Sequence, residues 1–368
     1  MQIVRMRRKV KIICAAALVA TVHFATSAFT FHVSEAPEWN QFFQKTNGWV
    51  GADVAFSIPL ETYKTCWLFG DTFVGQVNDR KRVDCRMIHS SIAIQQFGQK
   101  PQFFYPKDGQ SHPQSFMKSP DGKTDFWLMD GAVNKHGLNF FMLQMEWTGG
   151  GAWGFRSIGT WLASVKNPDA SPAHWKISTK KLPFVTLPDG EAVSLGSATL
   201  QSGGFVYIYS YSNQTNSTAQ KKLILARVPK NELNNSDEWE FFSNGSWAKN
   251  FAKATPIFSG APPEGSVSWQ PYLNKFVFVY TDGIWGKIVM RTADAPQGPW
   301  SEPTTLYQCP EMKISPQVFC YAAKGHPELS ATNELLISYA SNSENLSEVI
   351  NNTRLYWPRF IRVTFESH

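Results

Sequence analysis

Two aspartates stand in apolar segments early in the chain, where a charged side chain is costly to bury without a partner. Asp53 lies in GWVGADVAFSIPL and Asp71 lies in CWLFGDTF. Gly51 and Gly70 beside them permit a bulge or a close approach of another backbone. Paired carboxylates suit glycoside hydrolysis, in which one carboxyl group protonates the leaving oxygen while the other activates water or attacks carbon. The alternative is that both aspartates accept backbone N–H groups in turns.

Two further acids occupy comparable positions in later segments. Asp130 in FWLMDGAV could raise the pKa of the acid catalyst or orient a sugar hydroxyl, although its Asp-Gly context equally fits a turn. Glu264 precedes SVSW and is a candidate general acid if its loop faces the other carboxylates, or a solvated loop residue if it does not. We therefore predict Asp53 and Asp71 as the catalytic pair, with Asp130 or Glu264 tuning them.

Other polar and aromatic side chains are candidates for binding a substrate. His326 in KGHPELS could hydrogen-bond a substrate hydroxyl or carboxylate, and Trp269 could stack on the apolar face of a sugar ring. Arg291 and His89 are weaker candidates, since an ordinary structural pairing explains Arg291 better than substrate binding does. Most of the 14 tryptophans recur at equivalent places and are expected in the core.

Motifs for other chemistries are absent from the sequence. There is no phosphate loop, GxGxxG, HExxH or GxSxG in a supporting context, and the cysteine spacing fits no zinc site. We expect no metal or organic cofactor, with a structural calcium ion left open. The close pairs Cys66–Cys85 and Cys309–Cys320 are either disulfides or buried free thiols.

Short β-strands must position these side chains, because helical periodicity is almost missing after the first 30 residues. Apolar and aromatic runs bounded by Gly, Pro, Asn, Asp or Ser indicate strands and turns. A longer pattern of two strands, a turn with Pro and a strand with Trp recurs, and its first strands begin near 125, 193 and 266. A unit of about 70 residues is the mark of a repeat architecture.

The repeat predicts an all-β fold, a five-bladed β-propeller of four-stranded antiparallel blades that forms one domain over residues 32–368. The segment around Trp39–Phe43 would complete the last blade. Radial repetition brings the first strands of all units to one axis, where distant residues share a site. A pair of β-sandwiches would explain the strand density but not the repeat.

Composition and charge narrow the function further. The chain has 368 residues, of which 43% are hydrophobic and 17% charged, so a packed core is expected. A basic start followed by IICAAALVATVHFATSAF predicts a signal peptide over residues 1–28 and a secreted or periplasmic protein, with a retained anchor as the alternative. Beyond this segment basic and acidic residues nearly balance, which argues against nucleic acid as partner. We expect a monomer without membrane contact after cleavage.

Several of these segments resemble a known family. GADVAFSIPL with CWLFGDTF, MIHSSIAIQ, RTADAPQGPWSEP and YAAKGHPELS with PRFIRV are similar to the bacterial secreted family called domain of unknown function 4185, related to glycoside hydrolase family 183. The resemblance covers residues 45–365 and extends to five-bladed-propeller glycoside hydrolases. It implies an endo-acting hydrolase of a furanose polymer such as arabinan, with Asp53 and Asp71 as the catalytic pair.

The sequence departs from the family pattern in two places. WLMDGAV lacks the Pro-Gly that relatives have before the aspartate, and Gly265 separates Glu264 from Ser266. The leading hypothesis is a secreted glycoside hydrolase acting on a poly- or oligosaccharide. The alternatives are a non-catalytic carbohydrate-binding propeller and a polysaccharide lyase in which His326 abstracts a proton beside a uronate.

Overall fold

Strands dominate the computed structural model, which describes residues 29–60, 63–149, 151–213, 221–260 and 262–366. The expected signal peptide lies outside these residues. The all-β prediction is confirmed, and the described strands form six separate open sheets. No helix in the described part is long and apolar enough to span a membrane.

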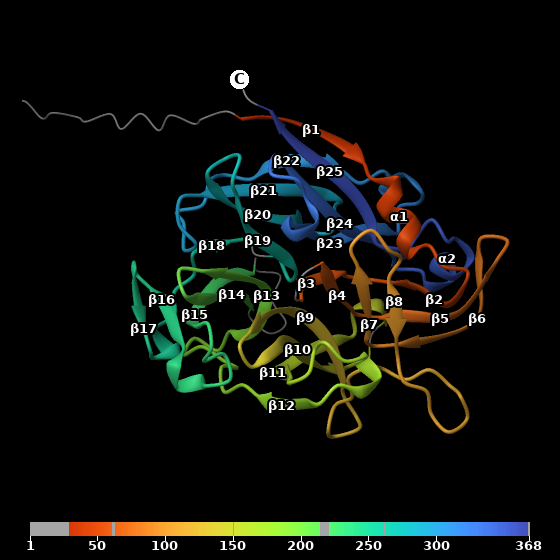
Figure 1. Ribbon diagram of the computed structural model, residues 1–368, viewed down its shortest axis with the longest axis horizontal. Coiled ribbons are helices and arrows are strands. Elements are labelled where there is room, and N and C mark those ends of the chain that lie inside the picture. Colours follow the sequence, from red (N-terminus) through yellow and green to blue (C-terminus); the bar gives the residue numbers. More distant parts are fainter. Residues whose placement is uncertain (1–28, 61–62, 150, 214–220, 261, 367–368) are drawn as a thin grey trace, which may run out of the picture.

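Five sheets each place their first strand at the centre of the molecule (Figure 1). In spatial order from the centre outward, their strands have the following bounds. The first unit consists of β3 (Phe56–Pro59), β4 (Lys64–Phe69), β7 (Ser91–Gln96) and β8 (Gln102–Phe104), and the second of β9 (Asp125–Asn134), β10 (Gly137–Trp147), β11 (Phe155–Val165) and β12 (Ile177–Lys181). The third unit consists of β13 (Ala192–Ser202), β14 (Phe205–Asn213), β15 (Lys222–Pro229), β16 (Glu240–Ser243) and β17 (Ser246–Ala248), with β18 (Phe258–Ser259) beside β15. The fourth unit consists of β19 (Gly265–Gln270), β20 (Lys275–Asp282), β21 (Lys287–Ala293) and β22 (Thr304–Gln308), and the fifth of β23 (Val318–His326), β24 (Glu334–Ser343), β25 (Arg359–Glu366) and β1 (Thr30–Glu35).

The first strands β3, β9, β13, β19 and β23 lie next to one another in chain order. A hydrogen bond between Ser57 of β3 and His326 of β23 connects the last unit back to the first. The first strands of three units begin at Asp125, Ala192 and Gly265, which confirms the spacing expected from the sequence repeat. Residues that precede these strands can therefore share one site although they are far apart in the chain.

The sixth sheet, β2 (Asn47–Ala52), β5 (Thr72–Asn78) and β6 (Lys81–Ile88), was not predicted. The β5–β6 hairpin leaves the first unit after β4 and returns to it at β7, so it pairs with β2 instead of lengthening the unit. The third unit also differs, because its sheet has six strands.

The prediction that the Trp39–Phe43 segment is the last strand of the fifth unit is wrong. This segment belongs to helix α1 (Pro37–Phe43), which starts with a proline at a position that suits helix initiation. The strand that completes the sheet is β1, in which Val33 pairs with Val363 of β25. Phe43 instead stacks on Phe360, with 5.1 Å between ring centroids, and so covers the sheet.

The core consists of apolar layers between neighbouring sheets. Phe140, Phe141 and Met142 follow one another on β10 and are all fully buried, so this strand is covered on both faces. Side chains of a strand alternate between faces, and face-to-face sheets share an interior of interdigitating side chains. The tryptophan of the repeat behaves as core in the third unit, where Trp239 is fully buried.

Arg82 on β6 is a buried cation that binds backbone carbonyl groups. No carboxylate in the described part of the chain forms an ion pair with it. Its guanidinium lies near the rings of Phe73 and Trp357. It donates to the carbonyl oxygens of Val50 (2.9 Å), Val349 (2.6 Å), Leu355 (2.8 Å) and Tyr356 (3.3 Å). Burial lowers the pKa of Arg82 to about 10. The side chain thereby joins β2, helix α2 (Leu346–Asn351) and the segment before β25.

Replacing Arg82 should destabilise the protein strongly. We expect Arg82→Ala to lower the free energy of unfolding by about 3 kcal/mol or more, because several buried carbonyl groups lose a charged donor. Urea denaturation measures this change. Arg86→Ala is the matched control, since Arg86 is exposed on the same strand and should change stability by at most about 0.5 kcal/mol. Equal losses for both variants would contradict this assignment.

Candidate functional site

The base of the β5–β6 hairpin brings Asp71 and His89 together. Phe69 pairs with Ser91 on one side of this point, and Thr72 pairs with Ile88 on the other. Asp71 and His89 therefore face each other across the hairpin, and His89 Nδ1 lies 2.9 Å from Asp71 Oδ1. The side chain of Asp71 is 15% exposed, so solvent reaches this pair.

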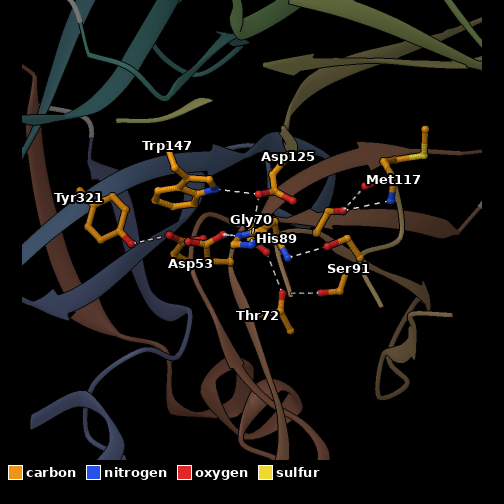
Figure 2. Close-up of polar contacts among 12 residues, drawn as sticks. Asp53, Gly70, Thr72, His89, Ser91, Met117, Asp125, Trp147 and Tyr321 are labelled. Carbon is orange, nitrogen blue, oxygen red and sulfur yellow. Dashed lines mark hydrogen bonds and ion pairs between the residues drawn. The ribbon is translucent and has the colours of Figure 1, made fainter. Parts of the chain in front are cut away.

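Asp53 lies beside Asp71, as predicted from the sequence. The backbone N–H of Asp53 donates to the carbonyl of Asp71 at 3.2 Å, and the N–H of Gly70 donates to the carbonyl of Asp53 at 3.3 Å. Tyr321 on β23 donates its hydroxyl to Asp53 Oδ2 at 2.7 Å (Figure 2). Asp53 Oδ1 is buried and has no hydrogen-bond partner among the described residues. The first and fifth units thus meet at this carboxyl group.

The backbone around Asp53 is unusually strained. Val54 has a φ of 52°, a left-handed conformation that a β-branched residue rarely adopts. Ala322 and Tyr356 also have positive φ angles, of 54° and 64°. Gly70 is required for a steric reason, since a Cβ there would lie 2.5 Å from Asp53 Oδ1. Strain of this kind persists where the surrounding structure imposes it, and it is concentrated at functional sites.

Asp125 and Trp147 complete the polar cluster, and sequence reasoning missed both. His89 Nε2 lies 3.4 Å from Asp125 Oδ2, and Trp147 donates its indole N–H to the same oxygen at 2.8 Å. His89 therefore contacts one carboxylate on each side of its ring (Figure 2). Asp125 is the first residue of the first strand of the second unit. Asp53 similarly lies near the start of the first strand of its unit, β3. An acid at the start of a first strand is therefore the sequence signal that could have identified Asp125.

Burial and neighbouring charges shift the proton affinities of these groups. Burial, together with the charges of Asp71 and Glu264, raises the pKa of Asp53 well above its usual range, against the opposing hydrogen bond from Tyr321. Burial by itself would lower the pKa of His89, but the hydrogen bond to Asp71 and the nearby carboxylates raise it overall. The cluster thus combines a carboxyl group whose pKa is raised with a second carboxyl group that is bonded to an imidazole.

Glu264 belongs electrostatically to this cluster. It directly precedes β19, and its charge contributes to the raised pKa of Asp53. Burial raises the pKa of Glu264 itself to about 7, although Lys221 opposes the shift. The catalytic role of Glu264 remains a prediction, which its proximity to Asp53 supports.

Asp130 requires a correction, because its surroundings are structural. Its Oδ2 lies 2.9 Å from Lys324 Nζ and accepts the N–H of Thr199 at 2.8 Å. Its Oδ1 accepts the N–H of Gly131 at 2.9 Å. Both side chains of the ion pair are buried, so both carboxylate oxygens are occupied within the protein. Asp130 therefore accepts backbone N–H groups, as the alternative interpretation of its Asp-Gly context predicts, and is not a free catalytic acid.

The prediction that His326 binds substrate also requires a correction. The residue is fully buried, and its ring nitrogens contact Ser57 Oγ at 2.7 Å and Ser338 Oγ at 2.8 Å. Burial lowers the pKa of His326 well below its usual range. Ser57 also donates to Glu328, so these residues form a polar network inside the fold. A group with both ring nitrogens occupied cannot contact a sugar.

Arg291 and Trp269 lie in surroundings that do not include the acids. Arg291 donates to Tyr280 Oη at 2.8 Å and to the carbonyl of Ser301 at 2.7 Å, which makes it a structural donor. Trp269 lies near the far end of β19 from Glu264, packs on Phe276 and is 42% exposed. Neither side chain therefore belongs to the polar cluster around Asp53, whereas His89 does.

The described cysteines are free thiols, so the disulfide alternative is wrong for both predicted pairs. Cys66 on β4 and Cys85 on β6 belong to different sheets, and burial raises the pKa of both thiols. In the described ranges, no group of three or more His, Cys, Asp or Glu side chains is arranged to hold a metal ion.

Two surface hollows lie away from the acids. One, of about 320 Å³, is lined by residues that include Lys45, Trp49 and Tyr105. The other, of about 190 Å³, is lined by Tyr63 and Phe97 among others, with Glu328 at its edge. Neither hollow includes Asp53 or Asp71, so the candidate site rests on the polar cluster itself.

The structural interpretation of Asp130 has a measurable consequence. Asp130→Ala should lower the free energy of unfolding by about 3–5 kcal/mol, because it leaves Lys324 buried and unpaired. The double variant Asp130→Ala/Lys324→Met should recover a large part of this loss, since it removes the unpaired charge. Chemical denaturation of the four members of this cycle tests the assignment. Additive losses would show that the two side chains act independently.

Comparison with known proteins gives a family and a shared fold. The family model described as a domain of unknown function (DUF5005) matches residues 37–365. The resemblance to domain of unknown function 4185 is therefore not confirmed. No curated protein sequence matches significantly. A candidate hydrolase from Bacteroides ovatus ATCC 8483 is similar in structure, with 20% identity, 90% coverage of each chain and a TM-score of 0.73. At this identity the similarity establishes the fold only.

Two glycoside hydrolases are more distant. A family 117 enzyme from Zobellia galactanivorans is 10% identical and covers 92% of this chain and 90% of its own, with a TM-score of 0.48. A GH43_1 enzyme from Xanthomonas citri is 12% identical and covers 89% of this chain and 90% of its own, with a TM-score of 0.47. These scores are too low to carry an argument about activity.

Proposed function

We propose, from the premise that this chain belongs to the family described as a domain of unknown function (DUF5005), that it is a glycoside hydrolase acting on a poly- or oligosaccharide. The observation that carries the proposal is the adjacency of Asp53 and Asp71, which are joined by backbone hydrogen bonds and have different side-chain partners. Burial and neighbouring charge raise the pKa of Asp53 well above its usual range, which favours its protonated form. Asp71 is bonded to His89, whose pKa is raised, and an imidazolium stabilises the charged carboxylate. Glycoside hydrolysis needs such a pair.

Asp53 is the proton donor in this mechanism. As the glycosidic C–O bond breaks, the proton of its carboxyl group moves to the leaving oxygen, which departs as an alcohol. Asp71 supplies the other half of the reaction, either by taking a proton from the attacking water or by attacking the anomeric carbon itself. His89 and Asp125 are positioning residues, because they orient Asp71 through the imidazole ring.

Glu264 tunes the donor. Its carboxylate, once charged, disfavours ionisation of Asp53, so the donor holds its proton at higher pH. The pKa of about 7 for Glu264 sets where this influence begins. Lys221 is the cation that opposes the rise, and no step of the reaction is assigned to it.

We further interpret the five sheets with central first strands as the blades of a five-bladed β-propeller. The sequence repeat and the order of the first strands support this interpretation. A furanose polymer such as arabinan is the first substrate to test, since the sequence resemblance implies it. The predicted signal peptide supports a role outside the cytoplasm.

The two alternatives differ in what they need from the site. A non-catalytic carbohydrate-binding protein would retain glycans without releasing products. It gives no reason for an acid with a raised pKa beside a second acid that is bonded to an imidazole. A lyase with His326 as base is disfavoured, because that imidazole is buried and both its nitrogens are occupied.

Substitution of each aspartate should separate the two roles. Asp53→Asn and Asp71→Asn should each lower kcat on an unactivated oligosaccharide by about 10²–10⁴-fold. On an aryl glycoside with a good leaving group, Asp53→Asn should recover activity, because that leaving group needs no proton, whereas Asp71→Asn should not. Product release is measured chromatographically after a polysaccharide screen with arabinan included. Asp79→Asn, in the exposed β5–β6 turn, is the matched control.

Full activity in either aspartate variant would remove that residue from the mechanism. Glycan binding by the native protein without product release from any substrate in the screen would replace the hydrolase proposal with the carbohydrate-binding alternative.

The pH profile should report the influence of Glu264. Activity that depends on protonated Asp53 falls as pH rises through the pKa of that residue. Glu264→Gln removes a negative charge and therefore lowers the pKa of Asp53, so the basic limb of the kcat profile should move to lower pH. The change should be confined to pH values above about 7, where Glu264 is charged in the native protein. A basic limb that stays in place or moves upward would contradict the tuning role.

A further inference from the structure

A continuous strip of aromatic rings borders the carboxylates, and the proposed mechanism does not use it. From one end to the other, the aromatic strip consists of Trp147, Phe155, Trp153, Phe319 and Tyr321. Successive ring centroids are 6.0, 6.5, 5.2 and 5.4 Å apart. The strip runs from β10 and β11 of the second unit to β23 of the fifth, so it spans two units that are not consecutive in the chain.

Both ends of the aromatic strip are hydrogen-bonded to acids of the candidate site. Trp147 donates to Asp125 at 2.8 Å and Tyr321 donates to Asp53 at 2.7 Å. Figure 2 shows both side chains extending toward the cluster around Asp53 and His89. The middle of the strip is also held, since Trp153 donates to Glu344 Oε1 at 3.1 Å. These contacts fix the rings relative to the reacting groups.

Two rings of the aromatic strip present large surfaces to solvent. Trp147 is 44% exposed and Trp153 is 48% exposed, whereas Phe319 is 9% exposed and supports Trp153 from behind. Solvent-exposed indoles that are held in place by hydrogen bonds and ring contacts lose little conformational freedom when a ligand binds. Flat aromatic faces complement the C–H faces of sugar rings.

Charge around the aromatic strip limits which saccharide fits. Asp71 and Asp125 flank His89 at one end of the strip, and Glu344 lies at its middle, so these three carboxyl groups outnumber the one imidazole. Asp53, at the other end, adds no cation. The buried cations nearby are engaged elsewhere, Lys324 by Asp130 and Arg82 by backbone carbonyl groups. An anionic saccharide would meet mostly like charges, which disfavours its binding.

We propose that the aromatic strip is a saccharide-binding platform beside the scissile bond, with Trp153 as its main exposed contact, and that it selects uncharged sugar chains. This inference rests on the proposed function for the meaning of "scissile bond", but binding to the strip is separable from catalysis. The chemical class of the ligand is a neutral oligosaccharide rather than a single sugar, because the two exposed indoles, Trp147 and Trp153, are separated by the ring of Phe155.

Binding to the full chain carrying Asp71→Asn tests the proposal without turnover. Isothermal titration with neutral arabinohexaose and xylohexaose, and with anionic hexagalacturonate, gives the dissociation constants. We expect at least one neutral hexaose to bind and hexagalacturonate to bind at least 10-fold more weakly. Adding Trp153→Ala should weaken neutral binding by at least 10-fold, while Trp153→Phe, which keeps a ring, should retain most of it.

Trp269→Ala in the same background is the matched control, since Trp269 is exposed to a similar extent but lies away from the acids. Its dissociation constant should not change. The proposal is overturned if Trp153→Ala binds as the parent does, if Trp269→Ala weakens binding equally, if neither neutral hexaose binds, or if hexagalacturonate binds as tightly.

The two proposals can fail separately. Neutral binding that depends on Trp153, together with no product release by the native chain, would retain the platform and reject the hydrolase. Hydrolysis by the native chain with an unchanged KM for Trp153→Ala would retain the hydrolase and reject the platform.

Discussion

The site depends on two carboxyl groups being held side by side, which is unfavourable unless one of them stays neutral. Reciprocal backbone hydrogen bonds join the segments of Asp53, Gly70 and Asp71, so neither segment can move away to relieve the repulsion. The protein answers this constraint with Tyr321 as a donor to one carboxyl group and His89 as a partner to the other. The strained backbone at Val54 results from the same constraint, because the residue next to Asp53 must adopt a left-handed conformation.

Buried charges in this fold divide into two kinds with different consequences. Lys324 is paired with Asp130 and Arg82 with backbone carbonyl groups, and both pairings connect separate parts of the fold. Asp53 is incompletely satisfied, with an oxygen that has no partner among the described residues. A buried charge with its partners in place stabilises the structure. A carboxyl group that has a free oxygen and lies next to another acid can still take part in proton transfer. Asp130 therefore resembles Asp53 in its sequence context but differs from it in its surroundings.

The aromatic strip gives the same site a second property. Rings from the second and fifth units meet beside the first unit, so the three units enclose the carboxylates from different sides. The acids would act on the reacting bond, and the rings would hold the sugar on either side of it. Both depend on the same arrangement of first strands, because each unit contributes only part of the site.

The sequence by itself determined the all-β class, the repeat and the proximity of Asp53 to Asp71. Alternating apolar runs, turn residues and a period of about 70 residues are local signals, and Asp53 and Asp71 stand out because they interrupt apolar segments. The sixth sheet, the helical state of Trp39 and the roles of Asp125, Trp147 and Tyr321 were decided by the tertiary structure. A histidine or aspartate in a strand looks the same in sequence whether its partners are buried serines, a lysine or another acid. Those partners come from distant units, and only the folded chain brings them within hydrogen-bond distance.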